Sequence, residues 1–425
     1  MKTRSTPARH ASANASGFTL VELMVALTGG LFVSLAVFAL ARDSGRFYQR
    51  ESRVANATVS ALLGFERLRS DIARAGFLSS PNVARDIRVC TPPSATWPAA
   101  LRNLASVQIQ TAVATGVLAT NGRNLQSIML GGSYASSDVY PAKIGPSGGP
   151  TVSFYIRPDS TALARLTNGA APTDAVMQSV FTPGQALRIV QYGKQYYGQI
   201  FSASGGSAPV VVINDSPPLQ FRSGATGGCG VNIIGSGAGE ATINVVNFIH
   251  YDLRNLSNNS QTPLGQTNYA TLYAASANGP GEADRTELVR VQQDVNGNAV
   301  NGTEEIVAEY AVDLGFQITA VTGSTNGGCC DPLISTVQSG AAAFTNFTTS
   351  VFATGSQPEL IRTVRVRLGV RSRESDRAAG TAQDTSAGPT QGLFRFNIGS
   401  GAEPFARVRT FQADVSLNNQ RDILW

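Results

Sequence analysis

The chain has 425 residues, of which 42% are hydrophobic, only 14% are charged and 43 are glycine. This balance favours an extracellular, β-rich protein with long turns over a helical cytosolic enzyme. The formal charge of +5 is small for this length. Net charge therefore gives no indication of a nucleic-acid-binding surface, and we expect no nucleic-acid partner.

The N-terminal segment has a basic part followed by an apolar part. Residues 1–16 contain no acidic residue, and after Gly17 an apolar run extends from Phe18 to Ala41, which is 24 residues. As a helix this run is about 36 Å long, enough to cross a hydrocarbon layer of about 30 Å. A cut after Gly17 removes three basic residues, leaves 30 basic and 28 acidic residues, and retains the apolar helix.

Glu22 interrupts the apolar run. A carboxylate within lipid is energetically costly, so an intramembrane Glu is expected to have a function and a partner. Cleavage after Gly17 would create an α-amino group on Phe18, four residues before Glu22. We expect this amine, in the same subunit or a neighbouring one, to pair with the Glu22 carboxylate.

The segment Gly17-Phe-Thr-Leu-Val-Glu22-Leu23 resembles the class III signal of type IV pilins and type II secretion pseudopilins. This resemblance implies that a prepilin peptidase cleaves between Gly17 and Phe18 and that Phe18 is then N-methylated. It also implies that Glu22 acts in assembly. Basic residues flank both ends of the helix, so the positive-inside rule does not settle its orientation. The resemblance implies a cytoplasmic N-terminus.

An amphipathic pattern continues the helix beyond the apolar run. Apolar residues at three- and four-residue spacing indicate one buried face, formed by Phe47, Val54, Ala61, Phe65, Leu68 and Ile72. We predict one helix from about Phe18 to Ala75 that stops at Gly76. Gly29-Gly30 is either a flexible or close-packing point used during filament insertion, or an ordinary glycine pair of a membrane helix.

The remaining chain predicts a β-rich head. Thirteen segments have strand character: Ser106–Thr111, Ser127–Leu130, Val152–Ile156, Leu187–Tyr192, Val210–Ile213, Thr242–Tyr251, Asn268–Ala274, Glu287–Val291, Glu305–Tyr310, Leu314–Thr319, Leu360–Arg371, Phe394–Asn397 and Phe405–Val415. Residues 372–392 are charged and then small and polar, which predicts a mobile loop. The expected fold class is α+β, and the expected divisions are a leader (1–17), a membrane helix (18–41), an amphipathic helix (42–76) and a head (77–425).

Several segments resemble particular members of this family. The end of the helix, Glu66 to Phe77, resembles that of PilW-type minor pilins and of the related J-type minor pseudopilin of type II secretion. Strand segments beginning at Glu287, Glu305, Ile361 and Phe405 resemble the later strands of the same family. Residues 80–285 carry no such resemblance, and the head is larger than is usual for the family.

Cys90, Cys229, Cys329 and Cys330 are the four cysteines. In a protein exported from the cytoplasm they favour disulfides, with buried free thiols as the alternative. Adjacent cysteines rarely bridge each other, so Cys329 and Cys330, if both are oxidised, should pair with Cys90 and Cys229.

Motifs for metal or catalytic chemistry are weak. The run from Asp294 to Glu305 matches a calcium loop at four positions, but Ala299 stands where that loop needs Gly, and a β-hairpin turn explains the Asn and Gly residues of the run without a metal. His10 lies in the leader, so His250 would be the only histidine of the mature protein. We therefore expect no catalytic site, no metal site, no cofactor and no enzymatic activity.

The expected function is structural. The resemblance implies a minor pilin that joins other minor pilins to prime a type IV pilus and lies at its tip. Its expected partners are the prepilin peptidase, the other minor pilins, the major pilin, the inner membrane and a tip adhesin. It would cross the inner membrane once, with a periplasmic head, before entering the extracellular pilus. The alternatives are a minor pseudopilin of type II secretion and a tip adhesin whose enlarged head binds a ligand.

Overall fold

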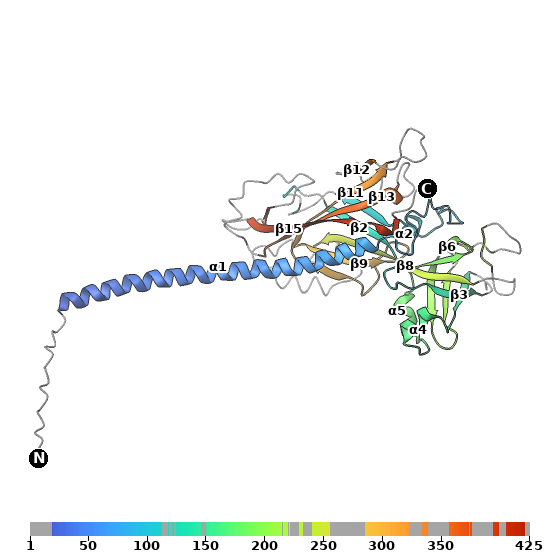
Figure 1. Cartoon of the computed structure of the whole chain (residues 1–425), viewed down its shortest axis with the longest axis horizontal. Helices are drawn as coiled ribbons and strands as arrows, with labels where there is room; N and C mark the ends of the chain where they lie inside the picture. The colour runs from blue at the N-terminus through green and yellow to red at the C-terminus, as the bar shows by residue number, and fades with distance from the viewer. Residues whose placement is uncertain are drawn as a thin grey trace, which may run out of the picture. The chain divides into compact units, whose positions relative to one another are not determined.

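The computed structural model describes residues 19–112, 118, 121–122, 125–145, 150–214, 216–219, 221, 229–232, 240–255, 285–322, 334–338, 357–373, 375, 394–398 and 405–420. The chain forms two units, Met1–Asn56 and Ala57–Trp425. The first contains most of an apolar helix, and the second is a large β-rich domain (Figure 1). The α+β class expected from the sequence is therefore confirmed.

One helix, α1 (Leu20–Arg74), occupies the N-terminal part of the described chain and has 55 residues. The sequence predicted almost the same bounds. The helix stops because Gly76 adopts a left-handed backbone, with φ of +75°, which an L side chain rarely adopts. The side-chain amide of Asn419 donates to the carbonyl of Ala75 (3.1 Å), which satisfies an acceptor left free at the helix end.

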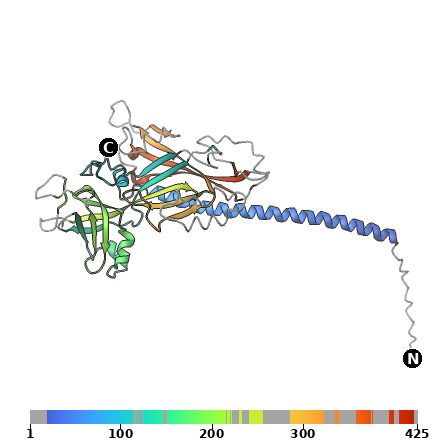
Figure 2. The same ribbon diagram turned by 180° about the vertical axis from the view of Figure 1, so that it is seen from behind.

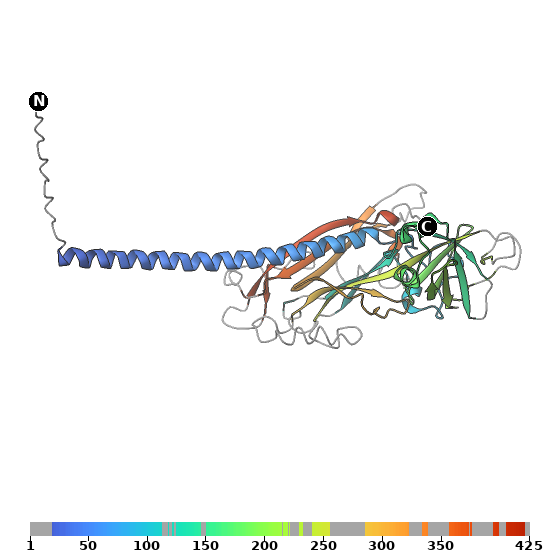
Figure 3. The same ribbon diagram turned by 90° about the horizontal axis from the view of Figure 1, so that it is seen from below.

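The C-terminal turns of α1 bury the expected apolar stripe in the second unit. Ala61, Phe65, Leu68 and Ile72 are all less than 5% exposed, whereas Phe47, which the sequence placed on the same stripe, is 66% exposed. The buried part of the stripe therefore begins later than the periodicity alone suggested. Figure 3 shows these last turns lying along the orange and red strands of the C-terminal part of the chain.

Two antiparallel sheets make up the described strands of the second unit. The larger sheet contains β1 (Val107–Ala112), β2 (Leu125–Gly132), β3 (Tyr140–Ile144), β4 (Thr151–Ile156), β5 (Ala186–Gln191), β6 (Lys194–Ser204), β7 (Val210–Asn214), β8 (Ala241–Arg254), β9 (Glu287–Gln293) and β10 (Glu305–Ala308). The smaller sheet has the order β12-β11-β13-β15-β14, formed by β11 (Ala311–Thr322), β12 (Ile334–Gln338), β13 (Ile361–Arg371), β14 (Arg395–Asn397) and β15 (Phe405–Ser416). Short helices accompany them: α2 (Ala99–Arg102), α4 (Thr161–Thr167), α5 (Asp174–Val180), and the 3-10 turns η1 (Pro358–Leu360) and η3 (Asn418–Gln420).

One apolar core joins α1 to both sheets. Side chains of α1 share it with alternate residues of β1, β2, β8 and β9 on one side and of β11, β13 and β15 on the other. The period-2 alternation of these strands places one face of each sheet in this core. The helix is therefore an integral part of the second unit from Ala61 onward.

Part of the larger sheet closes into a six-stranded antiparallel barrel. Its strands follow the ring β8-β3-β4-β7-β6-β5 and return to β8. The green and yellow strands of the barrel are seen from behind in Figure 2. The barrel strands share one buried apolar cluster with α4 and α5, which includes Tyr140, Phe154, Leu163, Met177 and Phe181. These described residues form a packed core.

Strand β8 belongs to both the barrel and the flat part of the sheet. Its first residues pair with β3 and β5, and from Asn247 onward it pairs with β2 and β9. At the change of partners two buried asparagines satisfy free backbone groups. Asn247 accepts from the N–H groups of Tyr134 and Ala135, each at 2.9 Å, and Asn244 donates to the carbonyl of Leu78 at 2.8 Å.

Most expected strands coincide with observed ones, including the hairpin β9–β10. Strands β3, β6 and β12 were not predicted. The expected strand Asn268–Ala274 lies outside the described residues, as does most of the expected mobile loop. Ser372, at the start of that loop, exchanges backbone and side-chain hydrogen bonds with Arg407.

Candidate functional site

The first turn of α1 holds Glu22 in a capping box with Thr19. The Glu22 carboxylate accepts hydrogen bonds from the backbone N–H (3.4 Å) and the hydroxyl (3.2 Å) of Thr19, and the Glu22 N–H donates to that hydroxyl (3.3 Å). The carbonyl of Thr19 accepts the first helical hydrogen bond, from the N–H of Leu23. Thr19 is therefore the N-cap, and Glu22 occupies the position at which a capping box requires Glu or Gln.

The helix surface beyond Glu22 is apolar. Within α1, Leu20–Gly45 is long and apolar enough to cross a membrane. Its large side chains are exposed on the isolated chain, including Leu23, Leu27, Phe32, Leu35 and Phe38. Glu22 is the only charged residue between Leu20 and Ala41. Its carboxylate is therefore the one electrostatic feature of this segment.

The two residues of the expected cleavage site, Gly17 and Phe18, lie outside the described residues. The pairing of Glu22 with a Phe18 amine therefore stays a prediction. Thr19 was not recognised from the sequence, although its spacing from Glu22 is the recognised signature of a capping box.

Cys90 and Cys229 form a disulfide. A disulfide was expected, but the pairing expected if Cys329 and Cys330 are both oxidised, in which each joins Cys90 or Cys229, was wrong. The two residues meet because the loop after α1 runs past the barrel, where Cys90 N–H donates to the carbonyl of Gln195 on β6. Cys329 and Cys330 lie outside the described residues.

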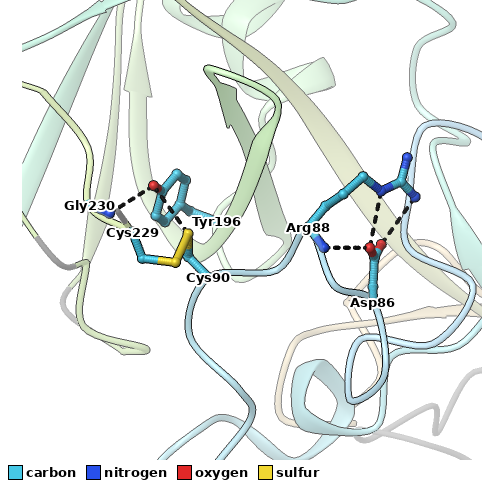
Figure 4. Close-up of a disulfide and its surroundings, with 6 residues drawn as sticks. All are labelled: Asp86, Arg88, Cys90, Tyr196, Cys229 and Gly230. Carbon is cyan, nitrogen blue, oxygen red and sulfur yellow. Dashed lines mark hydrogen bonds and ion pairs between the residues drawn. A yellow bond between two sulfur atoms is a disulfide. The ribbon is translucent and has the colours of Figure 1, made fainter. Parts of the chain in front are cut away.

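Polar contacts hold the loop and the barrel together around this disulfide (Figure 4). The Tyr196 hydroxyl lies 3.5 Å from Sγ of Cys90 and accepts a hydrogen bond from the N–H of Gly230 at 2.9 Å. Four residues before Cys90, the buried Asp86 carboxylate accepts from the N–H and the guanidinium of Arg88. The disulfide thus joins Cys229 to a loop whose own contacts hold it against the barrel.

A buried ion pair fixes α1 to the larger sheet. The Asp71 carboxylate accepts from Nε of Arg290 on β9 (2.7 Å) and from the hydroxyl of Tyr251 on β8 (2.8 Å). Burial and the Asp71 charge raise the pKa of the Tyr251 hydroxyl well above its usual value, so it remains a donor. The negative charge of Asp71 is therefore neutralised within the domain, and Asp71 has a structural role.

A second charged cluster surrounds Tyr310 at the turn between β10 and β11. Tyr310 has a left-handed backbone, with φ of +54°, and the guanidinium groups of Arg285 and Arg371 lie 4.0 and 5.0 Å from its ring centre. Its N–H donates to the carboxylate of Glu287 at 2.8 Å, and Arg285 contacts the same carboxylate. Burial raises the pKa of Glu287 to about 7, although Arg285 opposes the shift.

The other sequence candidates have structural positions. Asp294 accepts backbone hydrogen bonds from Asn296 and Asn298 in the β9–β10 hairpin turn. His250 lies on β8, where burial lowers its pKa, and neither ring nitrogen has a hydrogen-bond partner in the described part of the chain. Among the described residues no group of three or more His, Cys, Asp or Glu side chains is placed to hold a metal ion.

Comparisons with protein families, with characterised proteins and with solved structures found no match. The assignment of the site therefore depends on its own residues. The feature with the clearest functional chemistry is the charged first turn of the apolar segment Leu20–Ala41.

Proposed function

We propose that this protein is a structural subunit of a filament, a minor pilin that primes a type IV pilus and lies at its tip. The observation that carries the proposal is Glu22, which is the single charge between Leu20 and Ala41 of a helix able to cross a membrane and lies four residues after Phe18. A carboxylate kept at such a position is costly unless it has a partner.

The mechanism follows from the contacts of α1. The apolar surface after Glu22 would leave the lipid and pack against helices of neighbouring subunits, while the β-rich domain remains attached to the last turns of the helix. Glu22 would exchange its Thr19 contacts for the Phe18 amine of a neighbouring subunit. Because an unpaired carboxylate there is unfavourable, this pair would fix the axial register of the subunits.

The test compares three variants of the first turn. Glu22→Gln keeps a side chain able to complete the capping box but removes the charge, Glu22→Ala removes both, and Thr19→Ala removes only the hydroxyl of the cap. We expect all three to be cleaved after Gly17. Both Glu22 variants should fail to enter filaments, whereas Thr19→Ala should still assemble.

Three measurements decide between the outcomes. Mass spectrometry of the N-terminus should find a mature chain that begins with N-methylated Phe18, and Gly17→Leu should leave uncleaved precursor. Co-purification of other minor pilins and a count of surface pili then report assembly. Full assembly of Glu22→Ala would show that the carboxylate does not set the register.

The barrel supports a second candidate, a tip adhesin. It is formed by the segment between β2 and the second half of β8, within the region that has no counterpart in the resemblance. An added module with a packed interior offers surface for binding but is not needed for helix assembly. A change on the barrel surface that abolishes ligand binding but leaves the number of surface pili unchanged would favour this candidate.

A further inference from the structure

A surface cavity of about 620 Å³ lies at the C-terminal end of α1. Its walls come from three segments far apart in sequence: the end of α1 with Arg74 and Phe77, the β2–β3 connection with Tyr134 and Ser137, and η3 with Asn418 and Asn419. It therefore lies where the flat part of the sheet leads into the barrel. Its volume falls in the range of small-molecule sites, which often form between structural modules.

The lining offers hydrogen-bonding groups that no described residue of the domain uses. Nη2 of Arg74 donates to the carbonyl of Ser133 at 2.9 Å, but its Nη1 and Nε have no hydrogen-bond partner in the described part of the chain. The same holds for the Ser137 hydroxyl and the Asn418 amide. Asn419 uses its amide nitrogen to cap α1, which leaves its side-chain oxygen as an acceptor.

The charge and shape of the lining restrict the ligand. Among the described residues that line the cavity, Arg74 is the only charged one and none is acidic. Phe77 and Tyr134 supply aromatic surface, and Arg74 lies 5.5 Å from the Tyr134 ring centre, which holds its guanidinium at the wall. These groups suit a ligand that carries a carboxylate for the cation, several hydroxyls for the neutral donors and acceptors, and an apolar ring face for the aromatic surface.

We propose that this cavity binds an acidic saccharide, with its carboxylate on Arg74 and its hydroxyls on Ser137, Asn418 and Asn419. A planar guanidinium recognises a carboxylate in bidentate geometry. A peptide is less suitable, because the wall is built from turn and helix residues and presents no strand edge for main-chain pairing. This inference does not depend on filament assembly.

Isothermal titration calorimetry on the full-length protein in detergent micelles tests the proposal. The probes are glucuronic acid, an oligomer of six glucuronate units, the same oligomer with its carboxyl groups reduced to alcohols, and an acetylated acidic tripeptide. We expect saturable binding of the acidic oligomer and binding at least about tenfold weaker for the reduced oligomer, since a charge-assisted hydrogen bond is lost. Titration with glucuronic acid shows whether the site binds a single sugar or needs a polymer.

Variants of the wall locate the binding site. Asn418→Asp places a carboxylate in the cavity wall, at an exposed position with no described hydrogen bond, so the variant should fold normally and its negative charge should abolish binding of the acidic oligomer. Arg74→Gln should weaken the acidic oligomer about tenfold and remove its preference over the reduced one. Arg409→Gln removes an exposed arginine of β15 that is not part of the cavity wall and should leave binding unchanged.

Three results would overturn the proposal. One is the absence of saturable binding of both glucuronic acid and its oligomer by the wild-type protein. A second is binding that is the same in wild type and in Asn418→Asp, which would place the ligand elsewhere. The third is binding of the tripeptide but of neither sugar, which would assign the cavity to a protein partner.

Discussion

Two glutamates show how the same side chain takes different roles in this protein. Glu22 is exposed on the isolated helix and is satisfied locally by Thr19. Glu287 is 1% exposed and is held by Arg285 and the Tyr310 N–H. The sequence drew attention to Glu22, because a charge in an apolar run is conspicuous. The burial of Glu287 was not predicted, because it depends on strands distant in sequence.

Glu287 should make the stability of the domain depend on pH. Its pKa in the folded state is raised to about 7, so folding favours the protonated form. The stability that this group contributes is fully present below pH 4.5 and is lost as the pH rises through 7. From pH 4.5 to 7.5 the free energy of unfolding should fall by about 3 kcal/mol more in wild type than in Glu287→Gln.

Denaturant unfolding at a series of pH values measures this difference. Comparison with Glu287→Gln isolates the group from other titrating residues such as His250, whose lowered pKa acts in the opposite direction. Parallel pH profiles of the two proteins would show that the Arg285 charge keeps Glu287 ionised throughout.

At the scale of elements, the local sequence pattern was sufficient to predict α1 and most of the strands. The apolar run, the later stripe and Gly76 predicted both ends of the helix to within two residues. Strands β3 and β6 were missed because Pro141 and Gly198 interrupt their β pattern. Gly198 is needed for packing, since a Cβ there would lie 2.5 Å from Cδ1 of Ile213. Such a requirement comes from the neighbouring strand and is not visible in local sequence.

At Gly64 the helix α1 lies very close to strand β10. A Cβ at this position would lie 2.1 Å from the carbonyl oxygen of Val307 on β10, so Gly64→Ala should force the helix and strand apart. Overpacking of this kind costs about 1–3 kcal/mol, and the gain in helix propensity of about 1 kcal/mol offsets only part of it. Thermal unfolding of the domain should therefore occur at a lower temperature.

The matched control is Gly45→Ala in the same helix. Nothing lies within 4 Å of the Cβ that this substitution adds, so it changes helix propensity alone. The melting temperature of the domain should be unchanged in Gly45→Ala. Equal melting temperatures of the two variants would indicate that β10 moves to accommodate the added Cβ without loss of stability.

At the scale of the whole molecule, the barrel could not be predicted. Its closure requires β4 to pair with β7 and β8 to pair with both β3 and β5, and none of these pairs is consecutive in sequence. The prediction of the disulfide pairing was wrong for the same reason, because Cys90 and Cys229 are 139 residues apart in sequence and only the fold brings them together. The cavity at the end of α1 likewise needs three distant segments.

Loss of the disulfide should destabilise the domain without changing its fold. The long loop that the bond closes predicts a contribution of about 5 kcal/mol from loop-closure entropy, and measured losses are typically about 2–5 kcal/mol. Cys90→Ser with Cys229→Ser should lower the free energy of unfolding by that amount, and a reducing agent should have the same effect on the wild type. Non-reducing peptide mapping should recover a peptide pair linking Cys90 to Cys229. A link from Cys90 to Cys329 or Cys330 would contradict the structure.

The sharing of β8 between barrel and sheet has a mechanical consequence. Two modules joined by a flexible linker separate under tension at low force, whereas these are joined by one strand hydrogen-bonded on both sides. When the barrel is pulled along β8, these hydrogen bonds lie across the direction of force, so they resist together in shear and do not open one at a time. Tension applied to the barrel should pass directly into the sheet, and stretching a single molecule should rupture both parts in one step.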